Sequence, residues 1–87
     1  MTRLQQRVEH EPADIGAARL IASTIEPFID GIMKVCLFFA PDGRYFLEYE
    51  CSGWWWHLER EHVSADQAAR IFDALDRRVV SRAEAFP

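Results

Sequence analysis

The sequence predicts a small two-layer α+β domain. A three-stranded antiparallel β-meander carries an N-terminal and a C-terminal helix on one face, in the order α-β-β-β-α. Three observations predict this fold: apolar residues at helical spacing before residue 27, two turn motifs between segments of alternating polarity, and a helix-capping motif at residue 64. We expect the 87 residues to form a single domain, in which residues 1–11 are a loose tail or a frayed helix.

The first helix is predicted over residues 12–26. Pro12 suits the first turn of a helix, and Pro27 pushes the residue before it out of the α region. Between the two prolines, apolar residues recur every three or four positions, which makes one stripe: Ile15, Ala18, Ile21, Ala22 and Ile25.

The first hairpin is predicted from the turn motif Ala40-Pro41-Asp42-Gly43. Proline suits the second position of a type I turn, and Gly43 can take the positive φ that a three-residue hairpin loop requires. This turn sets the register of the two flanking strands, so Phe38 faces Phe46 and Lys34 faces Glu50.

The second hairpin is predicted from Ser52-Gly53, taken as a two-residue loop. It pairs Glu48 with His57 and Tyr49 with Trp56. Both hairpins then agree on one apolar sheet face, which would receive the helices: Val35, Leu37, Phe39, Tyr45, Leu47, Tyr49, Trp56 and Leu58.

The last helix is predicted to begin at a capping box, Ser64-Ala65-Asp66-Gln67, in which the Gln67 side chain reaches back to the amide of Ser64. Its apolar stripe continues to residue 79 and consists of Ala68, Ile71, Phe72, Leu75 and Val79.

Composition and charge exclude several function classes. The net charge is −4, which argues against direct nucleic-acid binding, because such surfaces need a basic face. No apolar run approaches the ~20 residues that a membrane span needs, and no apolar signal-peptide segment follows Met1. Cys36 and Cys51 show no metal-binding or redox spacing, so we expect free thiols and a cytoplasmic location.

The outer sheet face predicts a binding surface. The consecutive tryptophans 54–56 must alternate between the faces of a strand, so Trp55 points away from the predicted core. It shares that face with two further aromatic anchors and an acidic rim, and these residues are the predicted partner-binding set: Trp55, Phe38, Phe46, Glu48, Glu50, His57, Glu59 and Glu61.

No group of residues predicts catalysis or a cofactor. Glu48, His57 and Glu59 resemble part of a divalent-metal site, but a fourth ligand is missing and an ordinary cross-strand pair explains them better. Cys36 has no base beside it that would make it a nucleophile. The sequence therefore predicts a protein without enzymatic activity, cofactor or resident metal.

The function expected from the sequence is that of a small acidic interaction module that docks on a basic surface of a protein partner. An inhibitor or immunity-type protein fits this description, and a phage inhibitor of the anti-CRISPR kind is one version, based on size and charge alone. The alternatives are a homodimer that packs its outer sheet faces together and, third, a small metal- or ligand-binding module.

Overall fold

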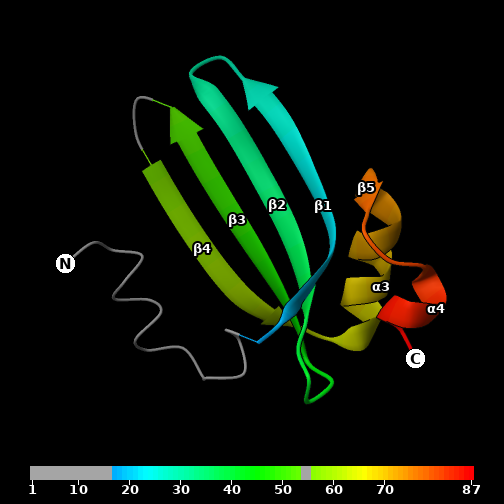
Figure 1. Cartoon of the computed structure of the whole chain (residues 1–87). Helices are drawn as coiled ribbons and strands as arrows, with labels where there is room; N and C mark the ends of the chain where they lie inside the picture. Colours follow the sequence, from blue (N-terminus) through cyan, green and yellow to red (C-terminus); the bar gives the residue numbers. More distant parts are fainter. Residues whose placement is uncertain (1–16, 54–55) are drawn as a thin grey trace.

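The computed structural model describes residues 17–53 and 56–87. The elements follow in the order β1 (Arg19–Phe28), β2 (Gly31–Phe39), β3 (Tyr45–Gly53), β4 (Trp56–Val63), α3 (Ala65–Ala74), β5 (Arg77–Arg78) and α4 (Arg82–Ala85). The strands form one antiparallel sheet in the order β4-β3-β2-β1-β5 (Figure 1). The predicted α+β class is confirmed, but this sheet has five strands rather than three and the helices are arranged differently.

The hairpin of β2 and β3 has the predicted register. Phe38 lies opposite Phe46, and Lys34 lies opposite Glu50. The turn closes with a hydrogen bond of 2.8 Å from the Ala40 amide to the Arg44 carbonyl, and Gly43 has a φ of 90°. Local turn chemistry therefore set this register, as expected for a short loop.

The predicted register between β3 and β4 is wrong. β3 continues through Gly53, and β4 begins at Trp56, so Ser52 lies opposite Trp56 and Glu48 lies opposite Arg60. The observed pairing of β4 differs by three positions from the pairing that a two-residue loop would give. Because side chains alternate between the two faces, a shift by an odd number of residues moves every side chain of β4 to the other face. Trp56 and Leu58 therefore leave the helix-covered face.

Packing explains the observed register of β4. It places Val63 opposite Tyr45, where Val63 is 6% exposed within the hydrophobic core beneath the helices. It also brings Arg60 opposite Glu48, with which it forms an ion pair of 2.6 Å. Both contacts depend on distant parts of the chain.

The predicted first helix is wrong where the structure describes it. Residues 19–28 form strand β1, and residues 12–16 lie outside the described residues. β1 pairs along β2 from Arg19–Phe39 to Phe28–Gly31, with a bulge between Leu20 and Ala22. The segment is rich in β-branched residues, and its pairing satisfies a strand edge of β2 that would otherwise remain open.

Helix α3 begins as predicted and ends earlier. Ser64 and Gln67 form the capping box, with a hydrogen bond of 3.1 Å from the Gln67 amide to the Ser64 hydroxyl. The helix ends at Ala74, so Val79 is 58% exposed and does not continue the stripe. Arg77 and Arg78 instead form β5, which pairs with Ala22 and Ser23 of β1.

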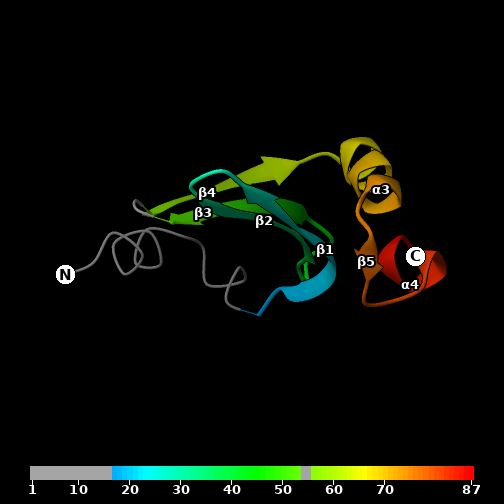
Figure 2. The same ribbon diagram turned by 90° about the horizontal axis from the view of Figure 1, so that it is seen from above.

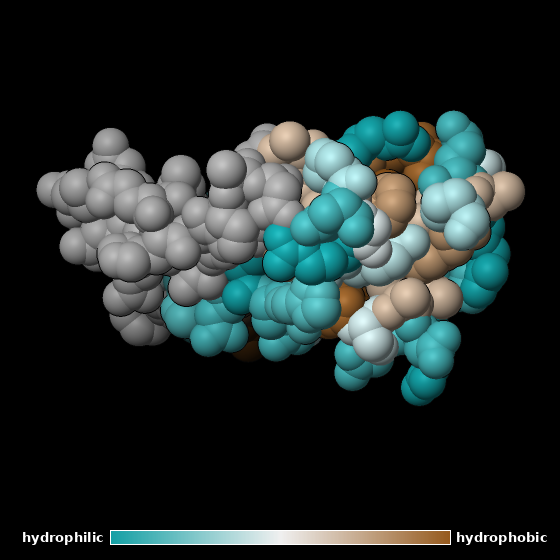
Figure 3. Space-filling model, turned by 90° about the horizontal axis from the view of Figure 1, so that it is seen from below, coloured by the Kyte–Doolittle hydropathy of each residue, from teal (hydrophilic) through white to brown (hydrophobic). Residues whose placement is uncertain are grey.

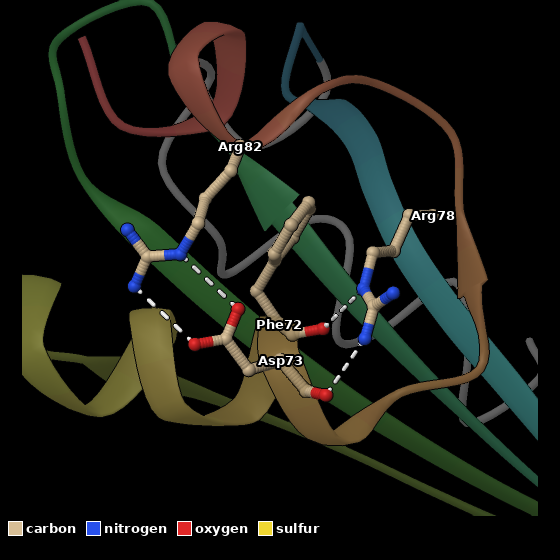
Figure 4. A network of polar contacts seen from close by, with 4 residues as sticks. All are labelled: Phe72, Asp73, Arg78 and Arg82. Atoms are coloured by element: carbon tan, nitrogen blue, oxygen red, sulfur yellow. Dashed lines mark hydrogen bonds and ion pairs between the residues drawn. The ribbon is translucent and has the colours of Figure 1, made fainter.

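A network of polar contacts fixes the chain after α3 (Figure 4). The Arg78 guanidinium donates to the carbonyl oxygens of Phe72 and Asp73, at 3.2 and 2.8 Å, which satisfies the last turn of the helix. Arg82 forms an ion pair of 3.1 Å with the Asp73 carboxylate, and its hydrogen bond lowers the pKa of Asp73.

The core lies between the sheet and the C-terminal helices. We call the sheet face that packs against these helices the first face, and the opposite face the second face. The core residues come from the first face and from the C-terminal segment: Ile21, Ala22, Val35, Leu37, Tyr45, Leu47, Val63, Ala68, Phe72, Leu75 and Ala85. The Tyr45 hydroxyl donates a buried hydrogen bond of 2.6 Å to the Ala85 carbonyl. The ring of Tyr45 also stacks on Phe86, so one strand residue holds the C-terminal turn in place.

The helices cover one end of the sheet. In Figures 1 and 2, α3, β5 and α4 gather beside the half of the sheet that contains the β2–β3 turn. We call this the proximal end; viewed from below, hydrophilic and hydrophobic residues are interspersed there (Figure 3). The opposite distal end carries the β1–β2 turn and the ends of β3 and β4, and no helix of the described residues reaches it.

Candidate functional site

The distal end carries an exposed apolar surface, which we call the apolar tip. Six large apolar side chains are strongly exposed among the described residues, and five of them lie here. Ile29 is the extreme case, with 97% of its surface exposed. The five residues of the apolar tip are Ile25, Phe28, Ile29, Ile32 and Trp56.

The sheet register divides the apolar tip between the two faces. Phe28 lies opposite Gly31 on the first face, whereas Ile25, Ile32 and Trp56 lie on the second face. Pro27, Ile32, Ser52 and Trp56 lie opposite one another in one row across four strands. Opposite residues project from the same face, so Ile32 and Trp56 lie on the second face of the sheet, away from the helices, about 10 Å apart across β3. The Trp56 indole donates a hydrogen bond of 3.1 Å to the Glu50 carboxylate, which fixes one end of the row.

Several carboxylates and one lysine lie near the apolar tip. Glu26 follows Ile25 in β1, Asp30 lies in the β1–β2 turn, Glu50 binds the Trp56 indole, and Glu59 lies on β4. Lys34, on β2, is the only lysine of the sequence. The distal end therefore combines exposed apolar side chains with carboxylates and with Lys34, which lies opposite Ile25.

The second face continues toward the proximal end as an aromatic surface with one ion pair. Phe38 and Phe46 lie side by side, and next to them Arg60 donates to Glu48 through Nε and Nη2 at 2.9 and 2.6 Å. The two charged side chains are only 12% and 18% exposed. With Ala18, these four residues line a small pocket of about 60 Å³.

The predicted binding residues are divided between the two faces. Phe38, Phe46, Glu48 and Glu50 share the second face, as the sequence predicted. The register of β4 places the other described members of that set on the first face: His57, Glu59 and Glu61. Trp55 lies outside the described residues.

The hypothetical metal site is separated by the same shift. Glu48 lies on the second face, whereas His57 and Glu59 lie on the first, where His57 Nε2 is 3.4 Å from a carboxylate oxygen of Glu59. Within residues 17–53 and 56–87, no three side chains of the metal-binding types lie together. His57 and Glu59 thus form an exposed pair on one strand.

A shallow groove runs between the first face and α3. Leu47, Val63 and Ile71 form its apolar floor, with polar residues at its rim, Tyr49, Glu61, Gln67 and Arg70. Burial raises the pKa of the Tyr49 hydroxyl, and the negative charges of Glu61 and Glu59 raise it further. Tyr49 therefore stays protonated at neutral pH, in which form its hydroxyl can donate a hydrogen bond.

Both cysteines are free thiols. Cys36 lies opposite Glu48 and Cys51 opposite Met33, so the two cysteines lie on different faces of the sheet. Burial is the largest cause that raises the pKa of the Cys36 thiol. The positive charge of Lys34 lowers this pKa, and the negative charges of Glu48 and Glu50 raise it. A thiol that stays protonated is a poor nucleophile.

The sequence predicted none of the five apolar-tip residues as part of a binding surface. Ile25 was expected in a helix and Trp56 in the core, and no role was predicted for Phe28, Ile29 and Ile32. A signal for them was present: Phe28 and Ile29 directly precede the turn motif Asp30-Gly31. Large apolar residues that border a hairpin turn are exposed unless another element covers them.

Known proteins do not supply a function for this site. The chain matches no family model, no curated protein and no solved structure. None of the helices in the described residues is both long and apolar enough to cross a membrane.

Proposed function

We propose that this chain is a non-enzymatic protein-interaction module that docks through its distal end. The partner would be a protein with an apolar recess bordered by basic side chains. The observation that carries this proposal is the concentration of exposed apolar side chains at one end of the sheet, with Ile29 at 97% exposure.

Exposure of the apolar tip to water is unfavourable in free energy. Burial of a large apolar side chain is worth roughly 1.5–3 kcal/mol, and this free energy is forgone while the side chain faces water. Single exposed apolar residues are common, but several of them gathered at one end of a molecule, near charged residues, are typical of an interface. Phe28 and Trp56 would be the anchors, since aromatic residues dominate the binding energy of most interfaces.

The charges favour a basic partner. Glu26 and Asp30 are next to apolar-tip residues in the chain, and Glu50 binds the Trp56 indole. Against these stands one basic neighbour, Lys34, opposite Ile25, and the net charge of the whole chain is −4. Complementary charge accelerates encounter and disfavours acidic partners. An inhibitor or immunity-type protein would use such a surface, and occupation of a basic nucleic-acid channel, as in an anti-CRISPR inhibitor, is the more specific form of the proposal.

The test is a capture experiment with matched variants. The wild-type chain, an apolar-tip variant (Ile29→Ser with Ile32→Ser) and a control (Val79→Ser) are immobilised and exposed to lysate of the source cells. Val79 is exposed at 58% but lies at the other end of the molecule, so the control removes a similar apolar side chain. We expect a protein that the wild type and the control retain and that the apolar-tip variant loses.

Equal capture by all three chains would refute docking through the apolar tip. Light scattering over a hundredfold concentration range tests the homodimer alternative. A doubled mass that only the apolar-tip variant loses would assign this surface to self-association instead of a foreign partner.

A further inference from the structure

The shallow groove between the first face and α3 has a buried apolar floor. Leu47 and Val63 in this floor are 4% and 6% exposed, and Ile71 of α3 is partly buried against the same core. The volume of the groove, about 290 Å³, lies just below the range of roughly 300–1,000 Å³ that is typical of small-molecule pockets. The groove is therefore large enough for one large side chain of a partner but too small to enclose a drug-sized ligand.

The two walls of the groove carry charges of opposite sign. One wall is strand β4, where Glu61 lies opposite Leu47 and Glu59 precedes it by two residues on the same face. The other wall is helix α3, which contributes Arg70 to the groove. Asp66 lies one turn before Arg70 on the helix, but it does not line the groove. The sheet wall is therefore negative and the helix wall is positive.

Both wall charges can bind a partner without first losing an ion pair. Within residues 17–53 and 56–87, the exposed side chains of Glu61 and Arg70 form no ion pair and no hydrogen bond, either with each other or with another group. The Tyr49 hydroxyl at the rim likewise makes no hydrogen bond to a described group. It can therefore donate to a main-chain carbonyl of a segment that lies in the groove.

We propose that this groove binds a segment of a protein partner that places one large apolar side chain between a basic and an acidic side chain. The apolar side chain would lie on Leu47 and Ile71, as an anchor residue does at the centre of an interface. The basic side chain would lie beside Glu61, and the acidic one beside Arg70.

The opposite charges of the walls select the partner. A segment with charges of only one sign would meet a like charge on one wall, which disfavours its binding. A mixed segment meets an opposite charge on both walls, and only one of its two orientations across the groove achieves this. The proposal concerns a surface separate from the apolar tip and does not rest on docking there.

The test is a peptide titration followed by nuclear magnetic resonance of the methyl groups of Leu47, Val63 and Ile71. The probe is an acetylated and amidated pentapeptide, lysine-serine-phenylalanine-serine-glutamate, whose three large side chains share one side of an extended chain. We expect it to shift these methyl signals, and replacement of its phenylalanine by alanine should weaken binding about tenfold. Peptides with lysine at both ends, or glutamate at both ends, should bind about two- to fivefold more weakly than this mixed peptide.

Charge reversal on one wall should change the order of the three peptides. Glu61→Lys should make the glutamate peptide the best ligand, and Arg70→Glu should make the lysine peptide the best, because the two walls then carry the same sign. Local damage to the groove would weaken all three peptides without reversing their order. Asp76→Lys and Arg77→Glu are the same charge changes at exposed residues outside the groove, and they should leave the order as in the wild type.

Two results would overturn the proposal: absence of binding of the mixed peptide, or an order of peptides that Glu61→Lys and Arg70→Glu leave unchanged. Shifts of the same methyl signals when the chain alone is concentrated would assign the groove to a second copy and would also overturn it. The apolar-tip variant should bind the mixed peptide like the wild type, which keeps this test separate from that of the apolar tip.

Discussion

Replacement of Gly31 by alanine should destabilise the distal end of the sheet. Gly31 lies opposite Gly53, where β2 and β3 begin and end. A Cβ atom on Gly31 would lie 1.9 Å from the Ser52 carbonyl oxygen and 2.8 Å from the Gly53 Cα, and both of these are backbone atoms. Cβ atoms essentially never approach another heavy atom within 3.0 Å, so the two strands would have to separate by about 1 Å.

The magnitude follows from the cost of overpacking. Forced displacement of packed atoms typically costs about 1–3 kcal/mol. In a domain of this size each kcal/mol lowers the melting temperature by roughly 4–8 °C, so Gly31→Ala should melt about 5–20 °C below the wild type. The assay is thermal and urea unfolding followed by circular dichroism.

Substitutions at Gly43 provide the matched control. No atom lies within 4 Å of a Cβ built there, and its φ of 90° is the sole obstacle to a side chain. Asparagine tolerates positive φ better than alanine, so Gly43→Asn should be milder than Gly43→Ala. Asparagine should give no such relief at Gly31, where the obstacle is steric. A Gly31→Ala variant within 0.5 kcal/mol of the wild type would refute the reasoning.

Two further predictions concern stability. Tyr45→Phe removes the donor to the Ala85 carbonyl and leaves that buried oxygen without it, so urea unfolding should show a loss of about 1–2 kcal/mol. Stability should also fall at alkaline pH, because burial raises the pKa values of Cys36, Tyr45 and Tyr49 in the folded chain. The folded state then binds more protons than the unfolded state, so the stabilisation is complete below the ordinary values, 9.0 for cysteine and 10.0 for tyrosine, and is lost as the pH rises through the raised ones. Urea titrations from pH 7 to 11 would measure this change in the free energy of unfolding.

Specific results would contradict these two predictions. A Tyr45→Phe variant as stable as the wild type would show that another group or water satisfies the Ala85 carbonyl. A free energy of unfolding that stays constant or increases between pH 9 and 11 would contradict the raised pKa values.

Of the candidate surface, the sequence predicted only the part that depends on the first hairpin. Phe38, Phe46, Glu48 and Glu50 share the second face because a single short turn sets their register. The register of the second hairpin divides the predicted binding residues between the two faces of the sheet. Glu59 and Glu61 lie on the opposite face because β4 pairs three positions away from the expected register.

The sequence by itself determined the features that a few neighbouring residues enforce. Pro41 and Gly43 define the turn between β2 and β3, and the Ser64–Gln67 capping box starts α3. A second motif of the same kind, Ser81 with Glu84, begins α4 and was equally available from the sequence. In each case the hydrogen bonds close within a few residues, so no distant contact is needed to select the conformation.

Only the tertiary structure decided the conformation of residues 19–28 and the register of β4. Ile21 and Ile25 are spaced for a helical stripe, yet their β-branched side chains also suit a strand, and local preference does not choose between the two. Pairing with the free edge of β2 made the segment a strand. Burial of Val63 beneath α3 likewise selected the register of β4, because the free energy of a buried side chain outweighs the preference of a short loop.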